Sequence, residues 1–316
     1  MSSDAAELPS ETGDLGKMAT IVRDPLVEDY ILELGIQNEG ECAEVRQRYE
    51  SGHLILLRDF RFDLDYTFLN SLDFDVDGPP EILRKVKKYG DNKIATLGPD
   101  STAPLDRFVF EAIFKSDVGR VEYYKEQVSS GNAQCDALYK KIFPQYRNTR
   151  QVKTWRFTST LYENLHWDNF EIPEVFHQVR IFSNIAASPR FWRTGPRIDH
   201  FAKAGYDEYG LGVFADKFGD DLVRRLNSAA LGGMKGACLD HFPKHHIAFE
   251  QGEVWLCETR IVSHQIYYGE RAFATMYFSD PDTMDRPELA FDARIKQLHE
   301  THSADRPVKT PLTAAR

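Results

Sequence analysis

Apolar residues recur at helical spacing in the first half of the chain. The segments EDYILELGIQ and EGECAEVRQRYESG, within residues 28–52, both predict helices, and SGHLILLRDF then predicts a short buried strand. The strongest helical pattern covers residues 103–143, where PLDRFVFEAIFKSDVGRVEYYKEQV and CDALYKKIF repeat apolar residues at helical intervals. A helical layer is therefore expected ahead of the main sheet.

Strand patterns dominate from Lys153 to Phe278. Apolar and β-branched runs are separated there by turn sequences such as EQGE and YGE, which is typical of antiparallel hairpins in a sandwich or barrel. The runs are VKTWRFTSTL, FHQVRIFSNI, HIAFEQ, EVWLCETRIV, HQIYY and RAFATMYF. We predict a mixed α+β fold with core strands at about 153–185 and 245–279.

The remaining segments suggest how the chain is divided. Residues 189–243 interrupt the strand region and contain the helical pattern ADKFGDDLVRRLNSAA, so they are predicted to form a lid insertion. RPELAFDARIKQLHE predicts a last helix. Residues 1–18 and 301–316 are polar and are predicted to be flexible tails, which leaves 19–300 as a single domain.

Composition and charge narrow the function classes. The 316 residues are 42% hydrophobic and 28% charged, as in a globular protein, and the formal net charge of −10 argues against a nucleic-acid partner. The four cysteines form no CxxC pair, which favours reduced thiols. No run approaches the roughly 20 apolar residues of a membrane span, so a cytoplasmic location is expected.

Motifs of other large enzyme classes are missing from the sequence. No GxGxxG opens a helix, GLGVFADKFG lacks the third glycine, and neither a GxSxG elbow nor a GKS phosphate loop occurs. Dehydrogenase, kinase and serine-hydrolase functions are therefore disfavoured.

The sequence LHWDNF carries the main candidate chemistry. If it is a strand, His166 and Asp168 project to one face and Trp167 to the other. One imidazole and one carboxylate are two thirds of the facial triad that holds non-haem Fe(II), and His264, near the end of a later strand, is the candidate third ligand. The alternative is that His166 and Asp168 are a surface pair on a strand or form a hydrogen bond with each other.

A candidate anion-binding residue follows the distal histidine. Arg271 lies on the far side of the same hairpin, at the mouth of an apolar strand, and a guanidinium there suits a dicarboxylate. The alternative is an arginine paired with Glu270 or with solvent.

These residues resemble the Fe(II)- and 2-oxoglutarate-dependent dioxygenases, which share the layout His-x-Asp, a long interval, a distal histidine and a basic residue. A closer resemblance, from about Ser51 to Met284, is to the bacterial hydroxylases of 3-deoxy-D-manno-oct-2-ulosonic acid (Kdo), the sugar acid of the lipopolysaccharide inner core. The segments that carry it, in order, are FPQYR, TWRFT, LHWDNF, VRIFSNIAASPRFWRTG, AFEQGEVWLC and VSHQIYYG.

The resemblance implies a double-stranded β-helix (jelly-roll, cupin-like) core with a flanking N-terminal helical layer. It implies Fe(II) held by His166, Asp168 and His264, with 2-oxoglutarate as cosubstrate, O2 as oxidant and ascorbate as a candidate stimulant. Hydroxylation would release succinate and CO2, and the presence of Asp168 favours hydroxylation over halogenation. The cosubstrate carboxylate would be bound by Arg271, from the general layout, or by Arg180, which fits the closer resemblance.

The leading substrate that follows is the Kdo sugar of a lipopolysaccharide or lipid A precursor. Trp192 and Arg193 are candidates for the substrate mouth. Arg190 and Arg197 are candidates for a sugar carboxylate, with plain solvated charge as the alternative. A glycolipid substrate implies peripheral contact with the inner membrane.

Two other functions stay open from the sequence. The chain could hydroxylate a small metabolite or amino acid, or it could be a non-catalytic cupin-like metal-binding protein. A second metal site at His241, His245 and His246 is disfavoured, because adjacent histidines on a strand point to opposite faces.

Overall fold

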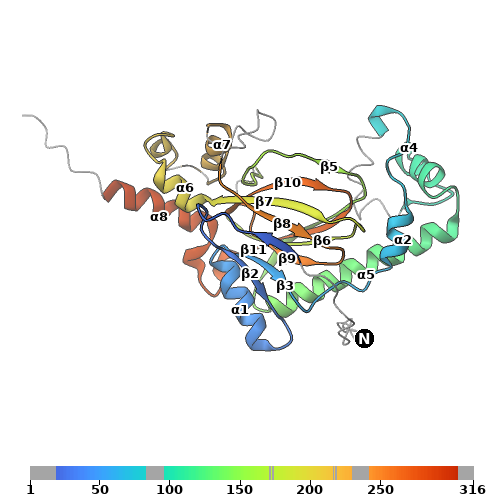
Figure 1. Cartoon of the computed structure of the whole chain (residues 1–316), viewed down its shortest axis with the longest axis horizontal. Coiled ribbons are helices and arrows are strands. Elements are labelled where there is room, and N and C mark those ends of the chain that lie inside the picture. Colours follow the sequence, from blue (N-terminus) through green and yellow to red (C-terminus); the bar gives the residue numbers. More distant parts are fainter. Residues whose placement is uncertain are drawn as a thin grey trace, which may run out of the picture.

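Two β-sheets pack face to face, and helices cover the outer side of the six-stranded one (Figure 1). The structure is a computed structural model and describes residues 19–82, 96–170, 172, 174–215, 217, 219–229 and 242–304. The predicted tail at 1–18 and most of the predicted tail at 301–316 lie outside these residues. The mixed content of helix and sheet predicted from the sequence is confirmed.

The first sheet has five strands in the order β1-β8-β7-β10-β5, and every neighbouring pair is antiparallel. Its strands are β1 (Thr20–Val22), β5 (Thr160–Leu161), β7 (Arg190–Arg197), β8 (His245–Phe249) and β10 (Val262–Gly269).

The second sheet has six strands in the order β2-β3-β9-β6-β11-β4. They are β2 (Ile31–Leu34), β3 (Leu54–Leu57), β4 (Asn148–Arg156), β6 (His177–Asn184), β9 (Val254–Leu256) and β11 (Ala272–Ser279). Only β2 and β3 run parallel to each other; the other neighbours are antiparallel. From β6 to β11 the chain passes repeatedly between the two sheets, so residues distant in sequence face one another across the space between them.

Large aromatic side chains from both sheets fill part of that space. The Trp192 ring of β7 meets the Phe182 ring of β6 at 4.9 Å and the Trp255 ring of β9 at 5.3 Å. Trp255 also stacks on Phe249 of β8 at 3.7 Å. Because burying aromatic surface is a major source of stability, these contacts fix the separation of the sheets and hence the geometry of anything held between them.

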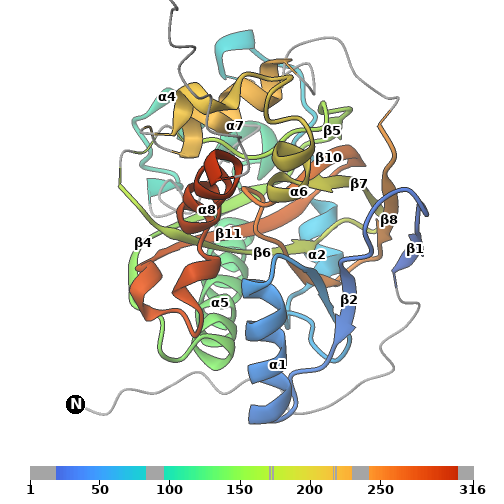
Figure 2. The same cartoon turned by 90° about the vertical axis from the view of Figure 1, so that its left-hand side faces the viewer.

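A second core lies between the six-stranded sheet and the helices on its outer side (Figure 2). These helices are α1 (Glu39–Glu50), α2 (Tyr66–Ser71), α4 (Pro104–Phe108) and α5 (Val118–Ile142), with a π-helical turn at Val109–Ile113. The long helix α5 approaches β4 closely at Gly131, where an added Cβ would come within 2.8 Å of the Trp155 ring. Glycine at this position therefore permits the close packing of helix on sheet.

Three further helices pack together at the end of the sheets. They are α6 (Ile198–Ala204), α7 (Gly219–Ala229) and α8 (Phe291–Ala304), and both α6 and α7 contact α8. Short 3-10 turns lie at Leu211–Phe214, Pro281–Thr283 and Pro287–Leu289. Within the part of the chain that is described, no helix is long and apolar enough to cross a bilayer.

Three element predictions need correction. Ile31–Leu34 is a strand paired in parallel with β3, although EDYILELGIQ predicted a helix. Arg190–Arg197 is a central strand of the five-stranded sheet, so the insertion predicted from residue 189 begins only after that strand. The last helix continues to Ala304, beyond the predicted tail boundary at 301.

A pair of buried ionisable residues makes stability depend on pH. His177 and Glu258 are fully buried, with Nδ1 and Oε2 3.5 Å apart. Burial raises the pKa of Glu258 to about 8, against the opposing charges of Arg260 and Arg294. The folded state therefore favours the protonated carboxyl group, and its contribution to stability is lost as the pH rises from about 4.5, the ordinary value, to about 8.

We expect Glu258→Gln, which mimics the protonated carboxyl group, to gain stability relative to the parent as the pH rises through that range. The gain should approach about 1.4 kcal/mol for each pH unit. Urea unfolding of both proteins between pH 5 and pH 8 measures it. Parallel stability curves would contradict a neutral Glu258 in the folded state.

Candidate functional site

His166 and His264 lie directly opposite each other. Each backbone N–H donates to the other residue's carbonyl oxygen, at 3.1 and 2.8 Å, which forms an isolated antiparallel bridge. The sequence suggested that LHWDNF is a strand. In the structure it is not a regular strand but a segment joined to β10 at one point. The two imidazole rings lie 4.5 Å apart, and both side chains are buried.

Asp168 completes a cluster of three potential metal ligands. Its Oδ1 lies 3.6 Å from His166 Nε2 and 3.8 Å from His264 Nε2. One ligand atom from each residue lies within 4.8 Å of the others, and no further group of this kind occurs among the described residues. The structure thus brings together the three side chains that the sequence singled out.

The donor set fits a divalent transition metal. His166 Nδ1 is 2.7 Å from the Asn164 carbonyl oxygen. Because a carbonyl only accepts, Nδ1 carries the proton and Nε2 presents its lone pair to the centre of the cluster. Burial lowers the pKa of His264 to about 3, so this imidazole is neutral and able to coordinate at ordinary pH.

Electrostatics favour an ionised carboxylate at the third position. Burial works against charge on Asp168, but the Arg180 guanidinium and the two imidazoles outweigh it and lower the pKa of this carboxyl group. The site therefore offers two neutral nitrogens and one anionic oxygen, which is the ligand chemistry of a facial two-histidine, one-carboxylate site.

Helix α7 holds the short segment between the first two ligands. The Asn227 side chain accepts from the Trp167 backbone N–H at 3.0 Å and donates to the Trp167 carbonyl at 2.7 Å. The Trp167 indole donates to the Ile261 carbonyl at 3.1 Å and is fully buried, on the side away from the ligands. Part of the predicted insertion therefore supports the metal-ligand segment from behind.

We expect Asn227→Leu to destabilise the fold by about 2 kcal/mol, because it leaves a buried N–H and a buried carbonyl without partners. Metal affinity should fall by about 10-fold or more, since supports behind metal ligands typically contribute that much. Urea unfolding and Fe(II) titration measure the two effects. Arg224→Ala, an exposed substitution on the same helix, is the control. Equal effects of the two substitutions would contradict a role of Asn227 in supporting the metal-ligand segment.

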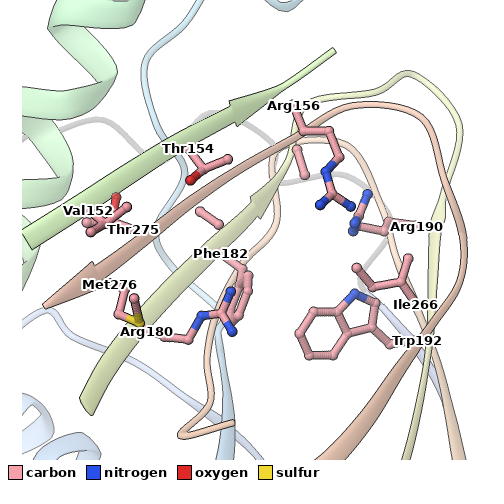
Figure 3. A pocket seen from close by; sticks show the side chains of 12 residues that line it. Val152, Thr154, Arg156, Arg180, Phe182, Arg190, Trp192, Ile266, Thr275 and Met276 are labelled. Carbon is pink, nitrogen blue, oxygen red and sulfur yellow. The ribbon is translucent and has the colours of Figure 1, made fainter. Parts of the chain in front are cut away.

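A cavity of about 240 Å³ lies between the sheets (Figure 3), next to the cluster but not lined by its three residues. Two of its lining residues contact the triad: the Trp192 ring stacks on the His264 ring at 5.3 Å, and Arg180 Nη1 hydrogen-bonds Asp168 Oδ2. The apolar part of the lining comprises Val152, Phe182, Trp192, Ile266, Ala272, Ala274 and Met276.

The opposite end of the cavity carries two guanidinium groups. Arg190 of β7 and Arg156 of β4 lie side by side there, away from Arg180 (Figure 3). Arg156 donates to Thr160 Oγ1 at 2.7 Å, whereas the buried Nη1 of Arg190 has no hydrogen-bond partner among the described residues. Burial and the charge of Arg156 lower the pKa of Arg190 to about 9. An anion between the two groups would relieve both effects.

Other candidate residues lie outside the cavity. Arg271 donates to the Leu72 carbonyl at 2.8 Å and to Asn70 at 3.3 Å, on the helical side of its sheet. Arg197 is tied to the Ser51 carbonyl and to Glu28, at 2.7 and 3.0 Å.

The remaining candidates are separated from one another. Arg193 lies over the Tyr267 ring at 3.9 Å and does not line the cavity that Trp192 lines. His245 bonds to the backbone at Asp24 and Glu28, His246 is exposed, and His241 lies outside the described residues.

The sequence did not identify Arg156 and Thr259 as site residues. Arg156 faces the cavity because β4 pairs with β11, and Thr259 reaches Asp168 from the turn after β9. Neither lies in a motif; the inward alternation along β4 was the only available signal for Arg156.

The chain matches no protein-family model and no curated protein sequence. Its fold matches solved structures of the Kdo hydroxylase KdoO, a non-heme Fe(II) alpha-ketoglutarate-dependent dioxygenase. The complex with alpha-ketoglutarate and Fe(III) aligns with a TM-score of 0.54 and 15% identity over 84% of this chain and 95% of that one. The cobalt(II) complex gives 0.55 and 17% over 89% and 98%. The resemblance seen in the sequence is thus confirmed for the fold.

Proposed function

We propose that the chain is an Fe(II)- and 2-oxoglutarate-dependent hydroxylase built as one catalytic domain on a double-stranded β-helix core. The observation that carries the proposal is a cavity with Arg180 and Trp192, which contact the cluster of His166, Asp168 and His264, at one end and two guanidinium groups at the other. A metal at the first end and a dicarboxylate reaching the second would use both features. The shared fold with the Kdo hydroxylase supports it.

The three side chains would hold Fe(II) on one face and leave three of six coordination positions for reactants. Bound Fe(II), with 2-oxoglutarate and O2, supplies the oxidation that places one oxygen atom in a C–H bond and releases succinate and CO2. The protein supplies ligand geometry and exclusion of water, the latter through the apolar wall of Trp192, Phe182 and Ile266. Ascorbate is a candidate stimulant of this reaction.

Arg190, assisted by Arg156, is our candidate for the far carboxylate of 2-oxoglutarate. Along β7, Arg190 stands four residues, or about 13 Å, from Thr194, the residue paired with His264; with the length of the arginine side chain, this leaves room for a short dicarboxylic acid between the triad and the guanidinium. Of the two arginines considered from the sequence, Arg180 lies at the metal end and Arg271 lies outside the cavity.

We further propose the Kdo sugar of a lipopolysaccharide precursor as substrate, because several solved structures that match this fold with TM-scores above 0.5 are of the Kdo hydroxylase KdoO. To reach a membrane glycolipid of this kind, a cytoplasmic protein would contact the inner membrane peripherally. The test is incubation of the Fe(II)-loaded chain with 2-oxoglutarate, O2 and either a Kdo-containing lipid or free Kdo.

Mass spectrometry should detect one added oxygen atom in the sugar, together with succinate at a matching rate. Succinate without sugar oxidation would reject Kdo and direct the search to small metabolites and amino acids. No succinate under any condition, with the metal shown to be bound, would favour a non-catalytic metal-binding protein.

A further inference from the structure

We infer that Arg180 and Thr259 cap one oxygen of Asp168, so that this carboxylate offers the metal a single oxygen. The inference rests on the proposed function and concerns how three coordination positions are kept open. It assigns Arg180 a positioning role at the metal end rather than the cosubstrate role considered from the sequence.

The two oxygens of Asp168 have different surroundings. Oδ1 faces the Nε2 atoms of His166 and His264, at 3.6 and 3.8 Å. Oδ2 instead accepts from Arg180 Nη1 and from the Thr259 hydroxyl, the latter at 2.5 Å. Since charge-assisted hydrogen bonds are the stronger kind, Oδ2 is held away from the position that a metal would take between the imidazoles.

The capping groups are themselves fixed. Arg180 Nη1 also donates to Thr259 Oγ1 at 2.9 Å, and its guanidinium lies over the Phe182 ring at 4.6 Å. The Thr259 backbone N–H donates to the Gln178 side chain at 3.0 Å, and its carbonyl accepts from the Asp168 N–H at 2.8 Å. Gln178 and Thr259 are fully buried, so the arrangement has little freedom to rotate.

The consequence follows from counting ligand atoms. Two imidazoles and a carboxylate bound through one oxygen fill three of six positions, and 2-oxoglutarate with O2 requires the other three. A carboxylate bound through both oxygens would take a fourth position. Loss of the cap should therefore leave metal binding largely intact but impair chelation of 2-oxoglutarate, a pattern that a purely structural role would not produce.

The test compares Thr259→Val, which removes only the hydroxyl, with Thr259→Ser, which keeps it. Arg180→Met and Arg180→Lys form a second pair, in which the lysine keeps the charge. Binding of 2-oxoglutarate to each Fe(II)-loaded protein is measured without O2. We expect Thr259→Val and Arg180→Met to weaken it by about 10- to 100-fold, the range for residues behind metal ligands. Thr259→Ser should remain near the parent.

Co(II) alone provides a readout that needs no 2-oxoglutarate, because its visible absorption changes with the number of ligand atoms. The spectra of Thr259→Val and Arg180→Met should differ from those of the parent and of Thr259→Ser. Unchanged Co(II) spectra in folded variants would overturn the inference. If the Co(II) spectra change but the parent fails to bind 2-oxoglutarate, the cap on Asp168 stands and the proposed cosubstrate fails.

Discussion

His264→Ala should weaken Fe(II) binding by more than about 100-fold and abolish 2-oxoglutarate turnover. Residues that merely support metal ligands contribute about 10- to 100-fold to affinity, and a ligand itself should contribute more. Its imidazole is neutral and points at Asp168, so its loss removes one of only three donor atoms. Titration of the metal-free protein with Fe(II) under anaerobic conditions measures the change.

His246→Ala is the matched control for this prediction. His246 lies on β8 in the same sheet, is exposed, and belongs to no group of metal ligands among the described residues. It should bind Fe(II) as the parent does. If this variant lost Fe(II) binding while His264→Ala retained it, the metal site would instead lie at His241, His245 and His246.

Arg190→Met should raise the KM for 2-oxoglutarate by about 100-fold and leave Fe(II) affinity close to that of the parent. Hydrogen bonds to charged groups contribute about 1.5–3 kcal/mol, which corresponds to roughly 10- to 150-fold in binding. The Arg190 guanidinium is buried at the end of the cavity opposite the triad, so the substitution removes an anion-binding group without touching the metal. Steady-state kinetics with varied 2-oxoglutarate measure the effect.

Arg271→Met separates this role from the alternative suggested by the sequence. Arg271 bonds to Leu72 and Asn70 on the helical side of the sheet, so its replacement should lower stability and change the KM for 2-oxoglutarate less than about threefold. The opposite ranking, with Arg271→Met raising the KM and Arg190→Met having little effect, would place the cosubstrate at Arg271.

The arrangement of the sheets was only partly predictable from sequence. Strands β6 and β11 follow from runs in which apolar and β-branched residues recur without Gly or Pro. Strand β7 was missed because RFWRTGPR contains Gly and Pro, which usually mark turns. Gly195 is required there by close packing, since a Cβ would lie 2.9 Å from Ser263 Oγ and 3.0 Å from Leu165.

Strand β2 shows the limit of periodicity in short segments. The four residues ILEL carry too little pattern to separate helix from strand, and the strand forms because β3 offers a parallel partner. Such tertiary pairing is not visible in a window of the sequence.

The site, like the fold, was only partly predictable from the sequence. A histidine and an aspartate separated by one residue, with a distal histidine, can be found in a sequence because the ligand types themselves are diagnostic. Arg156, Arg180, Arg190 and Thr259 act through contacts between segments that are far apart in the chain, and these contacts depend on how the strands pair. Their roles became visible only once the cavity and the hydrogen bonds of Asp168 were known.

The measurement that tests the central claim most directly is visible absorption of the metal-free protein after anaerobic addition of Fe(II) and then 2-oxoglutarate, with Asp168→Ala and His264→Ala in parallel. We predict that the charge-transfer absorption of a chelated complex appears in the parent chain and is absent from both variants. A parent chain that binds Fe(II) in full yet shows no such absorption would contradict the proposed 2-oxoglutarate chemistry.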